Sequence, residues 1–435
     1  MLVAKACCRK VAVIGLGRTG CSVITFLLGL GKEIFAMDDS VEAIDRLQIN
    51  VDLAPLCRSI GSMDVSILEQ MDLVVVSPGV NLQQPVFFLL REKGVSICGD
   101  VELFCQFNQT PLIAITGSNG KTTVTTLMVE TLRLAGKKVE AAGNIGAPVL
   151  DFLGRSDLDY IVLELSSFQL QSTYSLCADV AVVLNCTPDH LDQHASYAEY
   201  CQAKQRIYSG AQVAVVNADQ PRFKCAMPQK KITFSLLQGA DFTLQYEGDR
   251  VIVRYEQKQV GLASSWCLQG AHHFQNGLAL LALMQALELS LESALQVLTK
   301  FEGLEHRCQK IAESRGVFWY NDSKATNEGA CVAALQTLSD QSFSRIILLA
   351  GGDAKGASFS QLPDMIERYV DALIVFGQDG LMLKKIFERV TKVHMVDSMK
   401  SAIGLAADLA LPGDAVLLSP ACASFDMFDN YQHRG

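Results

Sequence analysis

The stretch LIAITGSNGKTT, residues 112–123, decides how the fold of this chain is read. An apolar run over residues 112–115 predicts a buried parallel strand, and Lys121 opens a helical run that continues to Ala135. The turn between them, residues 116–120, is rich in glycine. At such a strand-to-helix turn, backbone N–H groups and the helix dipole favour an anion, and a lysine adds a positive charge. The stretch therefore predicts a phosphate-binding loop.

The loop is a shorter variant of the common nucleotide loop. The common form, G-x-x-x-x-G-K-[ST], has its first glycine where Ile115 stands in this chain. The alternative is a tight turn with a surface lysine, but the strand before it and the helix after it favour a phosphate site. In such a site the Thr122 hydroxyl stands where the Mg²⁺ of a nucleotide takes a ligand.

Length and composition indicate a globular protein of several domains. At roughly 150 residues per domain, 435 residues predict about three domains. A hydrophobic content of 49% with 19% charged residues excludes a disordered chain. The net charge of −9 argues against a nucleic-acid-binding protein, which needs a basic face.

The cysteines and the N-terminus bear on the compartment. The 14 cysteines are scattered without zinc-finger spacing, which predicts mostly buried or idle thiols in a reducing cytoplasm. No apolar run approaches the roughly 18 residues of a spanning helix, so we expect no membrane segment. The first apolar run, residues 11–14, enters a glycine turn and does not resemble a signal peptide.

A second glycine-rich turn lies near the N-terminus, in KVAVIGLGRTG, residues 10–20. The spacing G-x-G-x-x-G follows a strand and precedes a helix over residues 21–30, and a strand over residues 33–37 ends at Asp38 and Asp39. This is the fingerprint of a dinucleotide-binding βαβ unit. Alone, this fingerprint indicates a phosphate near a helix N-terminus but does not identify the nucleotide. The acidic residue at the end of the second strand is suited to bind a ribose hydroxyl or a base edge.

Alternating strands and helices predict three α/β domains, at residues 1–109, 110–300 and 301–435. We expect a Rossmann-like first domain, a P-loop-type ATPase domain with a β appendage, and a Rossmann-like C-terminal domain. Further strands of the first domain are predicted at residues 73–76 and 95–98. For the central domain we expect strands at 138–141, 160–165, 179–184 and 213–217, antiparallel strands at 232–236, 242–246 and 251–255, and helices at 197–208, 275–286 and 291–298, the last two mainly core. For the third domain we expect strands at 317–320, 345–350, 372–376, 393–396 and 415–418.

Two residues at strand ends of the central domain indicate chemistry. Glu164 lies in an apolar strand, where a carboxylate is costly unless a lysine pairs with it or a metal binds it. Its place beside the phosphate loop favours Mg²⁺ over a lysine partner. His190, in PDHLD at residues 188–192, follows the next strand, and this position favours a functional role over a structural hydrogen bond.

Polar loops also follow three predicted strands of the third domain. For any one of them, helix capping by Asp or Ser is a sufficient explanation. Together with Arg307, Lys324 and Lys355, they fit a shared anionic site better. The loops are NDSKATN (321–327), GGDAK (351–355) and SPACASFD (419–426).

At this point the motifs resemble those of the Mur ligases, ATP-dependent amide ligases of peptidoglycan precursor synthesis. The resemblance covers essentially the whole chain, and GLGRTG, SPGV, GDVELF and the short first domain resemble the branch that adds D-glutamate. It implies a cytoplasmic, monomeric, ADP-forming enzyme of cell-wall synthesis, with consequences for cell shape and division. The motifs are TGSNGKTT (116–123), ELSSFQL (164–170), LN-x-x-PDHLD (184–192), HR (306–307), NDSKATN (321–327) and SPACASFD (419–426).

The resemblance implies a mechanism with an acyl phosphate. ATP phosphorylates the terminal carboxylate of UDP-N-acetylmuramoyl-L-alanine, and the amine of D-glutamate displaces phosphate. Lys121 is implied to hold the β and γ phosphates, Thr122 and Glu164 one Mg²⁺, and His190 a second. The family carboxylates a lysine at the position of Lys204, although Lys204 read alone predicts a solvated helix lysine.

The same resemblance assigns the remaining binding roles. ATP contacts are implied for Gly117, Ser118, Asn119, Gly120, Lys121, Thr122, Thr123, Asn276, Arg307, Asp322 and Lys324. Contacts to the UDP-linked substrate are implied for Arg18, Thr19, Asp38, Asp39, Ser77, Gly79, Asn144, Ser166 and Gln169. Contacts to D-glutamate are implied for Thr326, Lys355, Ser424, Phe425 and Tyr431.

One motif departs from the family. The usual G-x-H-N-x-x-N stands here as GAHHFQN, residues 270–276, with His273 in place of the first Asn. The contact that this Asn makes in the family is therefore not carried over to this chain.

Three alternatives remain open. A sister ligase with another amino-acid substrate, or a folate polyglutamylating enzyme, shares most motifs, although the first domain and GGDAK argue against it. An NAD-dependent dehydrogenase explains only the first domain and leaves TGSNGKTT and PDHLD without a role. A non-catalytic UDP-sugar sensor leaves Lys121, Glu164 and His190 unexplained.

Overall fold

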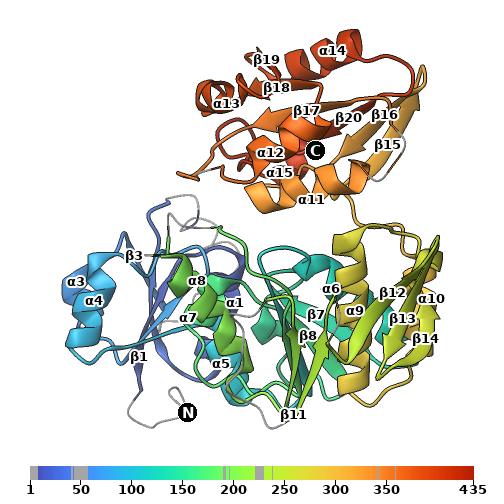
Figure 1. Ribbon diagram of the computed structural model, residues 1–435. Coiled ribbons are helices and arrows are strands. Elements are labelled where there is room, and N and C mark those ends of the chain that lie inside the picture. Colours follow the sequence, from blue (N-terminus) through green and yellow to red (C-terminus); the bar gives the residue numbers. More distant parts are fainter. Residues whose placement is uncertain are drawn as a thin grey trace.

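The structure, a computed structural model, contains three sheets in chain order (Figure 1). The first two lie side by side, and in this view the third lies above them. The structure describes residues 8–40, 43, 57–189, 193–194, 196–220, 230–237, 239–339, 341, 343–357 and 359–435, without the side chains of residues 57–60. Among these residues, no helix is both long and apolar enough to cross a membrane.

The first sheet has the order β3-β2-β1-β4-β5, and all of its strands are parallel. The predicted strands are confirmed within one residue at each end. The first helix begins at Arg18, three residues earlier than predicted, because Gly17 is already its N-cap. The elements are β1 (Lys10–Ile14), α1 (Arg18–Gly29), β2 (Glu33–Met37), β3 (Cys57–Gly61), α3 (Val65–Leu68), β4 (Leu73–Val76), α4 (Pro85–Glu92), β5 (Ser96–Gly99) and α5 (Asp100–Phe107).

The central sheet has the order β14-β13-β12-β11-β10-β9-β6-β8-β7. Strand β6 is fully buried because strands flank it on both sides. Its elements are β6 (Leu112–Thr116), α6 (Lys121–Leu134), β7 (Val139–Gly143), η1 (Val149–Phe152), β8 (Tyr160–Glu164), α7 (Ser167–Gln171), β9 (Val180–Val183), α8 (Tyr197–Gln205), η2 (Arg206–Tyr208), β10 (Val213–Asn217), β11 (Lys230–Phe234), β12 (Phe242–Glu247), β13 (Arg250–Tyr255), β14 (Lys258–Leu262), η4 (Ala263–Ser265), α9 (Ala271–Ala286) and α10 (Glu292–Lys300).

The expected β appendage extends the central sheet. Strand β11 was expected to be antiparallel, but it pairs in parallel with β10 and extends the central sheet. Only β12, β13 and β14 pair in antiparallel fashion, and β14 was not predicted. The prediction was wrong because a short apolar strand has the same side-chain pattern in either orientation.

The third sheet has the order β15-β16-β20-β17-β18-β19, with β15 antiparallel and the other strands parallel. The five expected strands are confirmed, and β15, whose side chains are largely exposed, was not predicted. The elements are β15 (Gln309–Ser314), β16 (Val317–Asn321), α11 (Glu328–Ser339), β17 (Ile346–Gly351), α12 (Leu362–Tyr369), β18 (Ala372–Phe376), α13 (Gly380–Phe387), β19 (Lys392–Met395), α14 (Met399–Leu409), β20 (Ala415–Leu418) and α15 (Tyr431–Arg434).

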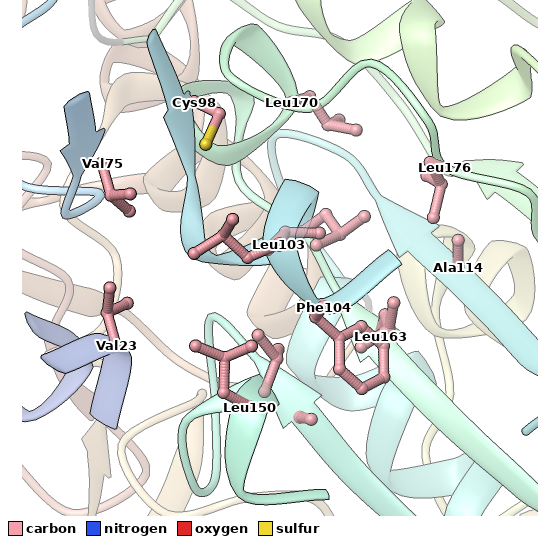
Figure 2. Close-up of a cluster of buried hydrophobic side chains, with 14 of the residues drawn as sticks. Val23, Val75, Cys98, Leu103, Phe104, Ala114, Leu150, Leu163, Leu170 and Leu176 are labelled. Carbon is pink, nitrogen blue, oxygen red and sulfur yellow. The ribbon is translucent and has the colours of Figure 1, made fainter. Parts of the chain in front are cut away.

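A single apolar cluster joins the first two sheets. Helix α5 lies between them, and its buried side chains contact residues of both. The two sheets that carry the glycine loops, at residues 15–20 and 116–120, therefore share one core. Figure 2 labels Val23 and Val75 from the first domain, Leu103 and Phe104 from α5, and Ala114 and Leu163 from the central sheet.

Candidate active site

The predicted phosphate loop connects β6 to α6, and it is held by the end of the neighbouring strand β9. The amides of Ser118 and Asn119 donate to the carbonyl oxygen and to Oδ1 of Asn185, at 3.0 and 2.9 Å. Gly120 has a φ of +82°, and a Cβ there would lie 2.5 Å from Oδ1 of Asn276. The loop therefore needs glycine at this position, and α9 approaches it closely.

Two lysines converge on the same carbonyl oxygen of the loop. Nζ of Lys121 donates to the carbonyl oxygens of Gly117 and Ser118, at 2.8 and 2.9 Å. Nζ of Lys204 donates to the carbonyl oxygen of Gly117 at 2.9 Å. Burial lowers the pKa of Lys121, and Glu164 opposes that shift.

Lys204 is not the solvated helix lysine that its local sequence predicts. Only 2% of its surface is exposed, and Nζ lies 4.5 Å from the ring centroid of Tyr200. The hydroxyl of Tyr200 in turn lies 2.9 Å from Oγ of Ser118. Burial first, and Lys121 second, lower the pKa of Lys204 to about 7. A large fraction of this side chain is therefore a neutral amine at pH 7.

Glu164 is the last residue of β8 and is fully buried. Its Oε1 accepts a hydrogen bond from Nδ2 of Asn144 at 2.7 Å, and its Oε2 has no hydrogen-bond partner among the described residues. A buried carboxylate oxygen without a donor carries a large desolvation cost. A hard cation beside Thr122 and the phosphate loop relieves that cost, so the donor set fits Mg²⁺. His190, Leu191 and Asp192 lie outside the described residues.

The third domain contributes a buried carboxylate, Asp322, and two half-buried cations, Arg307 and Lys324, to the same region. Asp322 accepts hydrogen bonds from Oγ of Ser419 at 2.7 Å and from the amide of Cys308 at 3.0 Å, and burial raises its pKa to about 7. Burial lowers the pKa of Arg307 and lowers that of Lys324 to about 8. Cations held in so little water have a strong attraction for a polyanion.

A pocket opens between the central and third domains, and several residues predicted to contact ATP line it. The first turn of α9, which was expected to be mainly core, forms part of its wall. The lining residues are Asn119, Gly120, Thr123, Asn185, His272, His273, Gln275, Asn276, Arg307, Cys308, Asp322, Lys324, Ala325, Ala330, Ala333 and Ala334.

Hydrogen bonds connect the two domains beside this pocket. Nδ2 of Asn327 donates to Oδ2 of Asp189 at 2.9 Å. Oγ1 of Thr337, on α11, lies 3.1 Å from Nδ1 of His272. Helix α11 therefore faces the central domain, as Figure 1 shows.

The first glycine loop lines a second pocket, of about 520 Å³, between the first and central domains. Oδ2 of Asp38 accepts from the amide of Leu16 at 2.6 Å, and Oγ of Ser77 donates to the carbonyl oxygen of Gly15 at 2.7 Å. The pocket brings together many of the residues predicted for the UDP-linked substrate, whereas Asp39 and Ser166 do not line it. Its lining is Gly15, Gly17, Arg18, Thr19, Asp38, Ser77, Pro78, Gly79, Val80, Gly143, Asn144 and Gln169.

Ser166 has a local structural role. It is the N-cap of α7, and its hydroxyl accepts from the amide of Gln169 at 3.2 Å. Oε1 of Gln169 accepts from the amide of Ser166 at 3.0 Å, which completes a capping box. This pair fixes the helix that carries Gln169 into the pocket.

The residues predicted for the amino-acid substrate lie at the ends of strands in the third sheet. Nζ of Lys355 lies 5.5 Å from the ring centroid of Phe425, which is 68% exposed, while Ser424 is buried. Tyr431 lies on the nucleotide side, with its ring centroid 3.8 Å from Nζ of Lys324. Thr326 is half-buried in the loop after β16.

Sequence reasoning missed Arg434, which connects these loops. Only 3% of Arg434 is exposed. Its guanidinium donates to the carbonyl oxygen and the hydroxyl of Ser323, at 2.8 and 3.0 Å, and to the carbonyl oxygens of Cys422 and Ala423, at 3.1 Å each. Burial lowers its pKa to about 10. No sequence pattern around Arg434 predicts these contacts, because the acceptors lie in the loops after β16 and β20, which only the fold brings together.

Comparisons with known proteins agree with this geometry. The chain matches the profile of the Mur ligase MurD-like N-terminal domain over residues 9–99, that of the Mur ligase middle domain over residues 115–284, and that of the Mur ligase glutamate ligase domain over residues 306–422. It is 42% identical to the UDP-N-acetylmuramoylalanine–D-glutamate ligase of Coxiella burnetii (strain CbuK_Q154), over 97% of this chain and 96% of the relative. It is 40% identical to the enzyme of the same name from Nitrosococcus oceani, over 97% of this chain and 94% of the relative.

Solved structures of low sequence identity share the fold. The UDP-N-acetylmuramate-alanine ligase of Thermotoga maritima aligns with a TM-score of 0.60 at 17% identity, covering 95% of each chain. The MurF ligase of Thermotoga maritima, solved in complex with ADP, aligns with a TM-score of 0.59 at 18% identity, covering 94% of this chain and 91% of that one. Together, the three domain matches and the near-full-length identities show that the chain belongs to the Mur ligase family.

Proposed function

We propose that this chain is an ATP-dependent ligase that adds D-glutamate to UDP-N-acetylmuramoyl-L-alanine during peptidoglycan precursor synthesis. The observation that carries the reaction class is a lysine-bearing phosphate loop beside a fully buried carboxylate, Glu164, one oxygen of which has no hydrogen-bond partner among the described residues. The names of the most similar relatives support the two substrates. We also propose that the enzyme works as a monomer in the cytoplasm.

The proposed reaction has two bond-forming steps. A carboxylate oxygen of the UDP-linked substrate attacks the γ-phosphorus of ATP, and ADP leaves. The amine nitrogen of D-glutamate then attacks the carbonyl carbon of the acyl phosphate, loses a proton, and phosphate leaves as the amide forms. Positioning and charge neutralisation supply most of the rate in such transfers.

The charged residues at the two pockets have proposed roles in this scheme. Lys121 holds the β and γ phosphates from the loop, and Arg307 and Lys324 approach them from the third domain. Asp322 and Asn276 bind the nucleoside, and the rest of the pocket lining between the two domains encloses it. The glycine loop of the first domain, with Asp38, binds the UDP end of the acceptor.

A divalent cation fits this site. We propose that Thr122 and Glu164 hold one Mg²⁺, and that His190 and a carboxylated Lys204 hold a second. Magnesium neutralises charge on the transferring phosphoryl group when it is bound. A neutral amine is the form that reacts with CO₂, and the lowered pKa of Lys204 supplies it near pH 7.

D-Glutamate is proposed to bind at the third sheet. Lys355 is suited to a substrate carboxylate, and we assign the further contacts with D-glutamate to Thr326, Ser424, Phe425 and Tyr431. A sister Mur ligase with another amino-acid substrate is the alternative, because these loops alone do not define the side chain that they accept.

Phosphate release is the direct test. The purified chain is incubated with Mg²⁺-ATP and UDP-N-acetylmuramoyl-L-alanine, together with D-glutamate, L-glutamate, L-alanine or meso-diaminopimelate. We expect release that depends on D-glutamate and an amide product by mass spectrometry. Phosphate release with another amino acid would identify a sister Mur ligase. Binding of the UDP-linked ligand without phosphate release would favour the non-catalytic UDP-sugar sensor.

A further inference from the structure

The pocket of about 520 Å³, here called the acceptor pocket, has one wall from the first domain and one from the central domain. Ser77 and Gly79 line it from the loop after β4, whereas Gln169 lines it from α7. The first wall belongs to a parallel sheet, and the second includes a helix of only five residues. The distance between the walls decides whether one ligand contacts both. Bonds that fix α7 to the first sheet therefore act on this pocket without touching its ligand.

Glu102, in the first turn of α5, holds the chain that follows α7. Its Oε2 accepts from the amides of Tyr174 and Ser175, at 2.7 and 2.8 Å. Its Oε1 accepts from Oγ of Ser175 at 2.8 Å and from Nε2 of Gln106 at 2.9 Å. Only 3% of Glu102 is exposed. A buried carboxylate with four donors is firmly held, and three of these donors belong to the central domain.

A second contact between the two domains lies at the end of β5. The amide of Gly99 donates to the carbonyl oxygen of Ser172, the C-cap of α7, at 3.1 Å. A Cβ at Gly99 would overlap Oγ of Ser172, so the two chains approach closely. In the sheet, Gly99 lies in register with Val76, the residue before the first-domain wall of the acceptor pocket. The end of α7 and that wall are therefore anchored on adjacent strands.

Hydrogen bonds continue from this anchor to Gln169. The hydroxyls of Ser172 and Thr173 donate to the carbonyl oxygen of Gln169, at 3.2 and 2.7 Å. The side chain of Gln169 is in turn fixed by its capping box with Ser166. Since Glu102 binds the two residues that follow Thr173, an unbroken set of contacts connects α5 to the part of α7 that lines the pocket.

We propose that Glu102 is a positioning residue for the UDP-linked acceptor, because it fixes the end of α7 at the distance from the first sheet at which one ligand contacts both walls. The inference rests on the proposed function, which supplies the identity of the acceptor. The glycine loop and Asp38, proposed to bind the UDP end, belong to the first domain alone. Loss of the Glu102 contacts should therefore weaken binding of the whole acceptor and leave binding of UDP itself unchanged.

The experiment measures dissociation constants for UDP-N-acetylmuramoyl-L-alanine and for UDP by calorimetry, in wild type, Glu102→Ala and Glu102→Gln. We expect Glu102→Ala to weaken acceptor binding about tenfold, because two amides lose their acceptor, and to leave UDP binding within about twofold of wild type. Glu102→Gln should stay within about threefold of wild type for both ligands, since glutamine keeps an oxygen for the amides and can donate to the Ser175 hydroxyl. Equal losses for acceptor and UDP in Glu102→Ala, or no loss, would overturn the proposal.

Glu328→Ala is the matched control. Oε1 of Glu328 also accepts from two consecutive amides, those of Gln361 and Leu362, at 2.6 and 2.8 Å, but within the third domain. This variant should leave both dissociation constants within about twofold of wild type. A loss of acceptor binding as large as that of Glu102→Ala would contradict a specific role for Glu102.

Gly99→Ala tests the same anchor by adding a group, and it decides the matter if Glu102→Ala does not fold. Gly99 has a φ of −99°, which any residue adopts, and the atoms nearest to an added Cβ belong to Ser172. We expect acceptor binding about fivefold weaker with UDP binding unchanged, and partial recovery when Ser172→Ala is added. Unchanged acceptor binding in a Gly99→Ala variant that is folded by circular dichroism would overturn the proposal.

Binding also separates this proposal from the proposed function. The dissociation constants are measured without ATP or D-glutamate, so they do not depend on turnover. If the variants behave as expected but wild type releases no phosphate with any amino acid, only the proposed function fails. If wild type releases phosphate but Glu102→Ala binds the acceptor as tightly as wild type, only the role of Glu102 fails.

Discussion

The molecule carries two glycine loops with the same sequence logic, a buried strand, a glycine turn and a helix N-terminus, yet their surroundings differ. The loop after β1 lines an open pocket of about 520 Å³ together with Arg18 and Asp38, and Asp38 accepts a hydrogen bond from the amide of Leu16. The loop after β6 has the side-chain nitrogens of two lysines, Lys121 and Lys204, on one carbonyl oxygen, that of Gly117. The first suits the binding of an anion, whereas the second brings two lysines to the place where we propose that a phosphoryl group moves.

The largest expected effect is at the second loop. Lys121→Met and Lys204→Met should each lower kcat at least about 10³-fold, because Lys121 is proposed to hold the reacting phosphates and the carboxylated Lys204 to hold a metal ion beside them. The measurement is steady-state phosphate release, with binding of the UDP-linked acceptor followed by calorimetry. Lys93→Met, at an exposed pair with Glu69, is the control.

Acceptor binding decides how independent the two loops are. We expect the affinity for the acceptor to stay within about twofold of wild type in both lysine variants, because the first loop lies in another pocket. A parallel loss of acceptor binding and turnover would show that the two loops do not work as separate sites.

At the first loop the expected effect is smaller and falls on binding. Gly15 has a φ of +87°, and a Cβ there would lie 2.9 Å from Cβ of Ser77. Gly15→Ala should cost about 1–2 kcal/mol in strain and raise KM for the acceptor about 10-fold or more, with KM for ATP unchanged.

Gly17 offers the matched control, since its φ is −68° and a Cβ there meets nothing within 4 Å. Gly17→Ala should leave the free energy of unfolding within about 0.5 kcal/mol of wild type. If the two variants are destabilised equally, the left-handed conformation of Gly15 is not what shapes this loop.

Both loops were predictable from the sequence because a strand, a glycine turn and a helix are adjacent in the chain. The burial of Glu164 was predictable too, since this residue lies within an apolar strand. The burial of Lys204 was not, because α8 has no apolar stripe to show which face is covered. Arg434 was invisible for a related reason: its acceptors, on Ser323, Gly351 and Cys422, lie at the ends of three different strands that only the fold brings together. Contacts set by topology leave no local pattern.

Helix α5, which packs between the first two sheets, supplies a pH-dependent prediction. Asp100, in the first turn of α5, is 3% exposed, and burial raises its pKa to about 6. Between about pH 6 and pH 4 the folded chain binds this proton more tightly than the unfolded chain, so this group adds stability as the pH falls through that window. The full effect is at most about 3 kcal/mol.

Asp100→Asn removes the titrating group and should remove that gain. Denaturation in urea at pH 7 and at pH 4.5, followed by circular dichroism, gives the difference for wild type and variant. The wild type should gain more stability on acidification than the variant does. An equal gain in both would mean that Asp100 is ionised in the folded chain throughout this range.

The smallest expected effect is at Asp38, the acid of the first loop. Its Oδ2 accepts from the amide of Leu16 and its Oδ1 from the amide of Ser40, at 2.6 and 2.8 Å. Asp38→Asn keeps one acceptor oxygen and loses the other, which costs about 1 kcal/mol and should raise KM for the acceptor about fivefold. Asp72 is a matched control, since one of its oxygens accepts from the amides of Arg9 and Lys10, at 2.8 Å each, at the start of β1. Asp72→Asn should leave both KM values unchanged, and an equal rise in the two variants would show that Asp38 supports the sheet and not the pocket.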